Sequence, residues 1–422
     1  MDNLTKKQKY QLKKHNLDIN YISNILKDIN NNKISYSKHL ISNNDIEFPS
    51  SMDFVKYNGL DKNNAKIGIS AIENGQIRYD IANGGAATRY FDINPDDIKR
   101  FKKLKSIKPK DIGLPKCLGK VIGSLNYLDL KLFFHLKYIY DIYGIKIPVH
   151  IMNNYLTNDL IRNYINKASK YYKFNFPLTY TVQTPLPRFT YNKNQKDIEL
   201  YKNEYGNLDF APPGHGDYLN LVKKTLINKN IKYIIYSNID NLGAVINPKI
   251  LGHHIKSGAD MTIEICKLYR GDTGGIPLIV KGKAQIVEQF KLPYNFNYLK
   301  APYFNCATYI FSVNALQKLN ITLPCYLVVK NAFKNPKQSL KTEKTFQVEH
   351  LLGDLSTHLK TNFIIVPREK RFWPIKRYVD LLRYIYPNIK NKLEMEQHYN
   401  FMKLLKEEYG ISNRIKARSF TS

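Results

Sequence analysis

The sequence IKYIIYSNIDNLGA, at residues 231–244, decides the fold of this chain. Its first half is apolar, β-branched and aromatic, which predicts a buried strand, and its second half turns polar at Ser237. In an open α/β sheet, ligands bind just beyond the carboxyl ends of the strands. We therefore expect Asp240 to hold a hard cation such as Mg²⁺, with Asn238 and Asn241 offering neutral oxygens beside it. Taken alone, the stretch is equally compatible with a plain polar loop in which Asp and Asn are turn formers.

Short apolar runs alternate with helical patterns along the rest of the chain, which predicts an α/β fold with a mostly parallel sheet. The predicted strands cover residues 66–70, 77–82, 147–152, 179–183, 231–236, 278–280, 284–290, 309–313 and 362–366, and the predicted helices cover 158–170, 218–228 and 248–257. The last helix has the clearest ends, because Asn247 caps it, Pro248 occupies its first position and Gly258 closes it. Residues 1–48 are charged and helical in pattern, so we expect a helical N-terminal arm that packs without chemistry of its own.

The composition excludes several classes of protein. With 422 residues, of which 43% are hydrophobic, the chain is long and apolar enough for a large core. Its four cysteines are far apart, which fits neither a disulfide framework nor a zinc site and favours a reducing compartment. The polar N-terminus is not a signal peptide, and no stretch has the length of a membrane span. We therefore expect a cytoplasmic protein without a membrane partner.

The net charge of +30 is the strongest compositional signal. It invites a nucleic-acid function, but lysine is spread along nearly the whole chain, and only residues 100–110 form a dense basic run. Nucleic-acid footprints are usually clustered, so we expect that nucleic acid is not the partner. A positive field suits an enzyme with polyanionic substrates equally well.

Three further stretches have the chemistry of a phosphate site. Residues 83–89 read NGGAATR directly after a predicted strand, and adjacent glycines allow backbone amides to approach a phosphate. Lys116 follows a proline, which fixes a compact cation with three donors. Residues 212–217 read PPGHGD, a stiff loop in which His215 stands between two glycines and is expected to face a ligand. Each stretch alone is also compatible with an ordinary turn or a solvated lysine.

In their order along the chain, these stretches resemble the UTP–glucose-1-phosphate uridylyltransferases, also called UDP-glucose pyrophosphorylases. The resemblance runs from Asn83 to Leu382. Its most specific parts are PPGHGD at 212–217 and NIDNLGA at 238–244, which favour the glucose enzymes over the related UDP-N-acetylglucosamine enzymes. The family's Arg-Phe-x-Pro-x-Lys pattern is similar to residues 371–376, which end in Lys376. The resemblance implies a Rossmann-like nucleotidyltransferase fold with a mixed, mostly parallel central sheet. It divides the chain into the arm (1–48), a catalytic domain (49–330) and a small C-terminal region without a β-helix (331–422).

The resemblance also implies a role for each residue of the site. It assigns charge stabilisation to Lys116, Lys376, Asp240 and Arg89, with Asp240 as the ligand of a Mg²⁺ cofactor; nucleotide binding to Asn83, Gly84, Gly85, Met152, Gln183, Gly214 and His215; and sugar binding to Asn238, Gly275, Glu288 and Asn305. Gln183 and the backbone of Gly214 would read uracil, and His215 would donate to phosphate.

The implied reaction joins UTP and glucose-1-phosphate into UDP-glucose and releases pyrophosphate. A phosphate monoester is already mostly ionised at neutral pH, so the nucleophile needs no general base. The reaction needs cations that cancel the repulsion between two polyanions.

Two other functions stay open. One is a uridylyltransferase for another sugar-1-phosphate, because Ala307 and Thr308 replace asparagines of the family, and the other is a non-catalytic basic binding protein. A monomer and a dimer are both compatible with the sequence.

Overall fold

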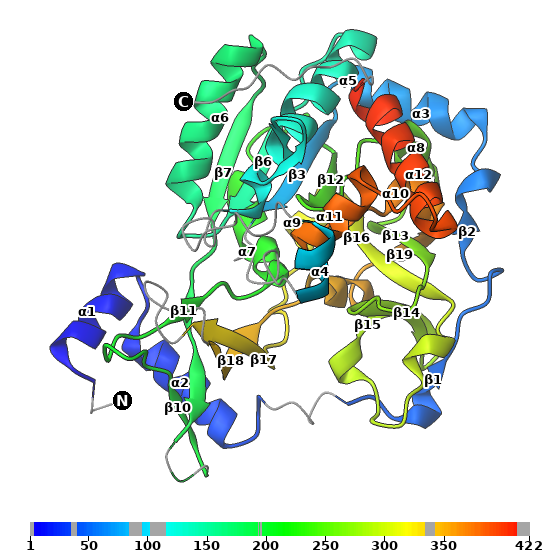
Figure 1. Cartoon of the computed structure of the whole chain (residues 1–422). Helices are drawn as coiled ribbons and strands as arrows, with labels where there is room; N and C mark the ends of the chain where they lie inside the picture. Colours follow the sequence, from blue (N-terminus) through cyan, green and yellow to red (C-terminus); the bar gives the residue numbers. More distant parts are fainter. Residues whose placement is uncertain are drawn as a thin grey trace.

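The computed structural model describes residues 4–34, 40–83, 95–101, 115–192, 194, 196–333 and 342–411. Within these residues, an eight-stranded sheet forms the centre of the molecule, in the order β2-β19-β13-β16-β12-β3-β6-β7 (Figure 1). Among its strands, β16 runs antiparallel to both neighbours, and the other pairs are parallel. The predicted α/β fold with a mixed, mostly parallel sheet is confirmed.

The elements have the following bounds. The central sheet contains β2 (Val55–Lys56), β3 (Ile77–Asn83), β6 (Val149–Asn153), β7 (Leu178–Val182), β12 (Tyr233–Asn238), β13 (Met261–Lys267), β16 (Tyr303–Ser312) and β19 (Thr361–Ile365). The other strands are β1 (Ile46–Glu47), β4 (Lys120–Ile122), β5 (Leu125–Asn126), β8 (Leu186–Pro187), β9 (Phe189–Tyr191), β10 (Ile198–Leu200), β11 (Phe210–Ala211), β14 (Gly275–Val280), β15 (Lys283–Glu288), β17 (Tyr326–Phe333) and β18 (Thr342–Glu349). The helices are α1 (Lys6–Lys14), α2 (Ile19–Asn30), α3 (Lys62–Glu73), α4 (Pro95–Arg100), α5 (Leu136–Tyr143), α6 (Asn158–Tyr172), α7 (Tyr218–Val222), α8 (Pro248–Ser257), α9 (Val313–Lys318), α10 (Arg368–Arg371), α11 (Tyr378–Ile385) and α12 (Lys392–Tyr409).

β12 lies inside the sheet because both of its faces are covered. Successive side chains of a strand point to opposite faces. Ile235 packs with the core that includes α3, α5, α6 and α8, whereas Ile234 and Tyr236 pack on the opposite face with α7 and α9. Since β12, β3 and β6 are parallel, their carboxyl ends open at one edge of the sheet, where a ligand is expected.

The ends of α8 are confirmed. The Asn247 side chain accepts a hydrogen bond from the Ile250 N–H at 3.1 Å, and Pro248 occupies the first turn, where no amide partner is needed. Gly258 ends the helix in the left-handed conformation, with a φ of 59°.

The strand predicted at residues 66–70 is wrong, because these residues lie within α3. A capping box starts this helix: the Asn64 N–H donates to the Asp61 carboxylate at 2.8 Å, and the Asn64 side chain accepts from the Asp61 N–H at 3.1 Å. Ala71 and Ile72 then bury one face of α3 in the main core. The helix predicted at 218–228 is shorter than expected, because α7 ends at Val222.

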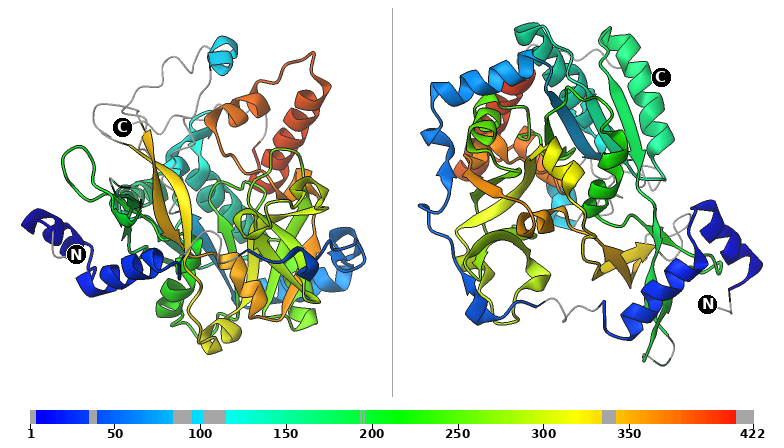
Figure 2. Two further views of the ribbon diagram at one scale, coloured as in Figure 1. Left: turned by 90° about the horizontal axis from the view of Figure 1, so that it is seen from below. Right: turned by 180° about the vertical axis from the view of Figure 1, so that it is seen from behind.

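The N-terminal arm packs on a second sheet, β10-β9-β18-β17, and the two form a smaller lobe (Figures 1 and 2). Ile22 and Ile29 of α2 share a buried cluster with Phe189 of β9 and Val348 of β18. The arm is helical as far as Asn30, and further along the chain β1 pairs with β14. Among the helices that the structure describes, none has the length and apolar character needed to cross a membrane.

Candidate active site

Asp240 lies two residues beyond the end of β12, at the edge of the sheet that the sequence predicts. Its Oδ2 atom is 2.7 Å from Lys116 Nζ, and the side chains of Lys116 and Asp240 are 14% and 21% exposed, respectively. Burial alone would raise the pKa of Asp240, but the charges of Lys116 and Lys376 outweigh this effect and hold the pKa below its ordinary value. The carboxylate therefore stays ionised in a partly buried, cationic setting.

The segment that carries Lys376 contacts the loop that follows β12, residues 238–244, called here the Asp240 loop. The Ile375 N–H donates to the Asp240 carbonyl at 3.1 Å. Lys376 follows as an exposed residue, and its charge acts on Asp240, His215 and Glu288. The structure thus brings Lys116, Asp240 and Lys376 together from three distant parts of the chain.

Asn241 connects the loop to this segment. Its Oδ1 atom accepts hydrogen bonds from the Trp373 N–H at 2.8 Å and the Gly243 N–H at 3.1 Å, and its Nδ2 donates to the Arg371 carbonyl at 3.2 Å. The residue is 2% exposed. The expectation that Asn241 offers an oxygen to a cation is therefore wrong, because the fold uses this side chain to join two segments.

The predicted nucleotide-binding residues meet at the ends of β3, β6 and β7. Gln183 Nε2 donates to the Gly214 carbonyl at 2.7 Å, and the Gln183 N–H donates to the Asn153 carbonyl at 3.0 Å. The Asn83 side chain, at the end of β3, donates to Asn153 Oδ1 at 3.1 Å. Met152 is 1% exposed and packs in the core on the α7 face, so it lies beneath this polar group.

The PPGHGD loop takes its conformation from close contact with the chain at His350. Gly214 has a φ of 79°, and a Cβ at this position would lie 2.6 Å from the His350 carbonyl oxygen. The Gly216 N–H donates to the same oxygen at 2.8 Å. His215 Nδ1 accepts from the Leu352 N–H at 2.9 Å, so the neutral ring carries its proton on Nε2, where it can donate to a ligand. Burial lowers the pKa of His215 and favours this neutral form.

Gly275 and Glu288, two of the predicted sugar-binding residues, lie opposite each other in the β14–β15 pair. A Cβ at Gly275 would lie 2.8 Å from Glu288 Oε1, so only glycine leaves the carboxyl in its place. Burial raises the pKa of Glu288 to about 7, and the charges of Asp354 and Glu349 act in the same direction. Glu288 is therefore a carboxyl group that can donate as well as accept near neutral pH.

The other two predicted sugar-binding residues lie on β12 and β16. Asn238 ends β12 and is partly exposed. The Asn305 side chain turns back to its own strand, where it donates to the Tyr309 hydroxyl and accepts from the Ala307 N–H, both at 2.9 Å. Both of these hydrogen bonds of the Asn305 side chain stabilise the conformation of β16 itself.

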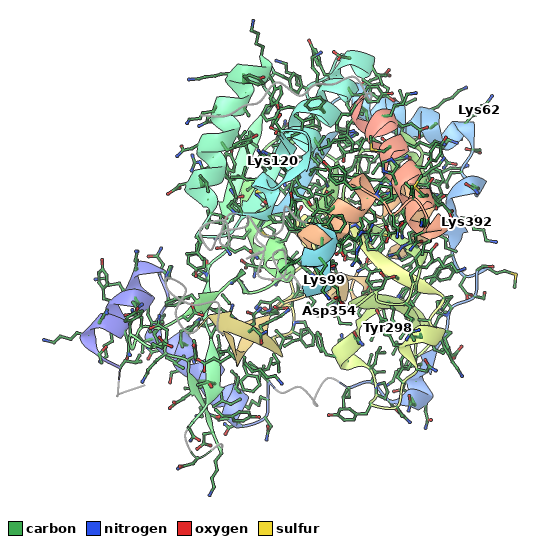
Figure 3. The ribbon with its side chains drawn as sticks, viewed as in Figure 1. Lys62, Lys99, Lys120, Tyr298, Asp354 and Lys392 are labelled. Carbon is green, nitrogen blue, oxygen red and sulfur yellow. The ribbon has the colours of Figure 1, made fainter. Side chains whose placement is uncertain are left out.

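Sequence reasoning missed a charged group on and near β17 and β18. Lys330 Nζ lies 3.4 Å from Glu349 Oε1, and Lys291 Nζ lies 3.0 Å from Asp354 Oδ1. The charges of Glu349 and Asp354 act on both His215 and Glu288, which places them at the same site. Figure 3 shows Asp354 in the middle of the molecule, beside β14 and β15. A strand with scattered charged residues is ordinarily a solvated face, so no sequence pattern separates this group from the other lysines and acids.

Three residues of the predicted site, Gly84, Gly85 and Arg89, lie outside the described residues, as does most of the basic run at 100–110. Their roles stay predictions.

The described residues suit a Mg²⁺ ion that arrives with substrate phosphates. They contain no group of three or more His, Cys, Asp or Glu side chains that could hold a metal by themselves. Asp240 supplies one ionised, partly exposed carboxylate. Mg²⁺ commonly binds through one or two carboxylates together with phosphate oxygens, so this donor set fits the ion.

An α/β sheet that gathers lysines and one carboxylate at its strand ends has the arrangement of an α/β protein whose site is suited to phosphate chemistry. Sequence comparison gives the family. The chain belongs to the UTP–glucose-1-phosphate uridylyltransferase family, whose model matches residues 111–408. A relative of that name from Pyrus pyrifolia is 28% identical over 311 residues, which cover 68% of this chain and 63% of the relative. For a relative from Hordeum vulgare, the identity is 27% over 285 residues, which cover 64% of this chain and 57% of the relative. The matched region thus spans about three-fifths of the length of these relatives.

Solved structures share the fold. The UDP-glucose phosphorylase of Trypanosoma brucei superposes with a TM-score of 0.66 at 21% identity, over 86% of this chain and 74% of that one. A Leishmania major UDP-glucose pyrophosphorylase variant, solved with UDP-glucose, gives a TM-score of 0.64 at 17% identity, over 89% of this chain and 77% of that one. A putative UDP-N-acetylglucosamine pyrophosphorylase from Entamoeba histolytica gives 0.59 at 17% identity, over 78% and 82% of the two chains. The chain therefore has the nucleotidyltransferase fold that the resemblance implied.

Proposed function

We propose that this protein is a uridylyltransferase that makes UDP-glucose. A phosphate oxygen of glucose-1-phosphate attacks the α-phosphorus of UTP, the bond from that phosphorus to the oxygen bridging to the β-phosphate breaks, and pyrophosphate leaves. The convergence of Lys116, Asp240 and Lys376 at the end of β12, in a member of this family, is the observation that carries the proposal.

The residues of the site match the demands of this reaction. The nucleophile is already ionised, so the site must cancel charge rather than remove a proton. Lys116 contacts Asp240 and the charge of Lys376 acts on it, so both ammonium groups can stabilise phosphates that bind beside Asp240. The Gln183 side chain and the Gly214 backbone, which hydrogen-bond to each other, would read the uracil edge, and His215 keeps an N–H on Nε2 for an oxygen of the nucleotide.

We also propose Mg²⁺ as the cofactor, held by Asp240 and the phosphates of UTP. The bound ion would neutralise phosphate charge and orient the triphosphate. Lys116 now contacts Asp240 Oδ2, and we expect its ammonium to move toward phosphate when the nucleotide binds.

The test is pyrophosphate release by the purified protein. UTP should be combined in turn with glucose-1-phosphate, galactose-1-phosphate and N-acetylglucosamine-1-phosphate, with TTP and ATP as alternative nucleotides. We expect turnover with UTP and glucose-1-phosphate, and strong rejection of the other bases, because a polar reader is left unpaired when the wrong base binds. Equal turnover with UTP, TTP and ATP would contradict the assignment of the uracil readers.

A second candidate is a uridylyltransferase for another sugar-1-phosphate. The observation that favours it is the state of Asn305, whose side chain bonds to Tyr309 and Ala307 within β16. The sugar pocket would then depend on Glu288 and Gly275, and the sugar panel above decides between the two candidates.

Asp240→Asn tests the metal assignment. The change keeps the shape of the side chain but removes the charge that holds Mg²⁺, so we expect turnover to fall by about 100-fold or more while UTP still binds. UTP affinity and the Mg²⁺ dependence of turnover should be measured for both proteins, with Asp141→Asn at an exposed position of α5 as the matched control. Normal turnover with an unchanged Mg²⁺ requirement would place the metal elsewhere.

The remaining expectations stay predictions from the sequence: a cytoplasmic location, weak binding to nucleic acid, and a monomeric or dimeric state.

A further inference from the structure

Lys131 is a fully buried lysine beneath the Asp240 loop, and the proposed reaction does not use it. Its exposed fraction is 0%. It belongs to a seven-residue π-helical segment, Asp129–His135, that leads into α5. Such segments are rare and often occur at functional sites. Burying an ammonium group is expensive, so its presence needs an explanation.

The hydrogen bonds of Lys131 do not supply that explanation. Its Nζ atom donates to Asn238 O and Ser237 Oγ at 3.0 Å, and lies 3.2 Å from both Ala244 O and the Tyr79 hydroxyl. Each of these acceptors has another partner within the described residues.

The second partners of these acceptors lie in the same loop and in β3. The Tyr79 hydroxyl donates to Ala244 O at 2.6 Å and lies 3.1 Å from Ser237 Oγ, and the Asn241 N–H donates to Asn238 O at 3.3 Å. Among the described residues, no carboxylate oxygen lies within 4.0 Å of Lys131 Nζ. The lysine is therefore neither required to satisfy the loop nor neutralised by an ion pair.

The position of Lys131 points to Asp240. Its amino group contacts residues on both sides of Asp240, at Asn238 and Ala244. Burial lowers the pKa of Lys131 to about 7 while the charge of Asp240 opposes this shift, and the charged form in turn acts on the Asp240 carboxylate. His135, one turn further along the π-helical segment, accepts a hydrogen bond from the Ile246 N–H through Nε2 at 3.1 Å. Lys131 thus contacts both ends of the loop, and His135 contacts the chain just beyond it, at Ile246.

We propose that Lys131 is a positioning residue for the site: its buried amino group holds the loop from Asn238 to Ala244 so that the Asp240 carboxylate faces the phosphates. This role rests on the proposed function and adds a residue that touches no substrate. The buried amino group keeps the site in place but lowers the stability of the fold. A lysine kept only for the fold would instead raise that stability.

The decisive variant is Lys131→Met, which keeps an unbranched apolar side chain and removes only the terminal amino group. The matched control is Lys137→Met, which removes an exposed lysine of α5 that pairs with Asp141. Trp373 is the single tryptophan of the chain, and its backbone bonds to Asn241 and Leu242 in the loop. Its fluorescence therefore reports the order of the loop without any need for turnover.

The full-length proteins should be compared in thermal unfolding, acrylamide quenching of Trp373, UTP affinity without metal, and kcat and KM with Mg²⁺. For Lys131→Met we expect an unfolding midpoint equal to or above that of the wild type and at least twofold greater quenching. We also expect UTP affinity within threefold and a kcat lower by tenfold or more. Lys137→Met should match the wild type in all four measurements.

Three results would overturn the proposal: a variant that does not fold or has a clearly lower midpoint, quenching equal to the wild type, or a kcat within threefold of it. The first would show a lysine kept for the fold. If the wild-type protein released no pyrophosphate, the proposed function would fail, and the unfolding and quenching measurements would still decide whether Lys131 orders the loop.

Discussion

Ala307 holds a backbone conformation that alanine disfavours, with a φ of 51° inside β16. Glycine adopts this left-handed region without the clash of a Cβ. We expect Ala307→Gly to raise the free energy of unfolding by about 0.5–1 kcal/mol, since the relief of strain exceeds the added entropy of the unfolded chain. Chemical denaturation measures the change. Ala301→Gly is the control, because Ala301 has a φ of −63° and should lose stability. Equal losses in the two variants would show that Ala307 is unstrained.

Glu288 gives the stability a defined pH dependence. Burial raises its folded-state pKa from 4.5 to about 7, so between these values the folded protein holds a proton that the unfolded chain has released. The free energy of unfolding therefore falls as the pH rises from about 4.5 through 7, by up to about 3 kcal/mol from this group. Glu288→Gln should lose less stability than the wild type between pH 5 and pH 8 in denaturant titrations. The exposed Glu407→Gln should keep the wild-type dependence, and identical curves for Glu288→Gln would contradict the raised pKa.

Single residues were predictable where their chemistry depends on position after a strand. Asp240 was expected beyond β12 because the strand ends of a parallel sheet meet at one edge. Gln183, directly after β7, was singled out by the family resemblance. Asn241 was misread because its role depends on Trp373 and Arg371, more than a hundred residues away. Lys131 carried no sequence signal, since one lysine in an apolar helix reads as a surface position.

At the scale of elements, the PPGHGD loop is fixed by its contact with the chain that leaves β18. A Cβ at Gly216 would lie 2.5 Å from the His350 carbonyl carbon, and this neighbour is backbone that cannot turn aside. Gly216→Ala should therefore displace the loop, and with it the Gly214 carbonyl that Gln183 contacts. We expect UTP affinity to fall by about tenfold or more, a cost of about 1.4 kcal/mol.

Binding of UTP by calorimetry measures this effect. Gly59→Ala is the matched control, because a Cβ at Gly59 meets no heavy atom within 4 Å. An affinity for UTP unchanged in both variants would show that this loop does not form the nucleotide site.

Elements with strong local signals were predicted well, and those decided by packing were not. β12 is a continuous apolar run, and α8 has a cap, a proline and a closing glycine. The run at 66–70 is too short for its periodicity to decide, and the capping box at Asp61 makes it part of α3. The pairing of β9 and β18, far apart in the chain, had no local signal at all.

At the scale of the whole molecule, the C-terminal part of the chain completes the site. The C-terminal segment bonds to the Asp240 loop through Ile375 and Trp373, and the Tyr409 hydroxyl at the end of α12 donates to the Leu242 carbonyl at 2.5 Å. β19, from the same part of the chain, pairs with β13 and β2 in the central sheet. The alternation of strands and helices predicted the fold class. The pairing of distant segments within the central sheet had no such signal, because tertiary packing decides it.

The net charge of +30 predicts that the molecule attracts polyanions such as duplex DNA. Within the described residues, lysines occur in both lobes, from α1 to α12, whereas a duplex footprint requires a clustered row of cations. We expect duplex DNA to bind weakly, without sequence preference, and with an affinity that falls by about 10³ or more between 50 and 200 mM salt if about six phosphates are contacted. Fluorescence anisotropy with two unrelated duplexes at both salt concentrations measures this. A tight complex that persists at 200 mM salt, or a preference for one duplex, would mean that the charge forms a nucleic-acid site and would favour a binding function over the enzyme.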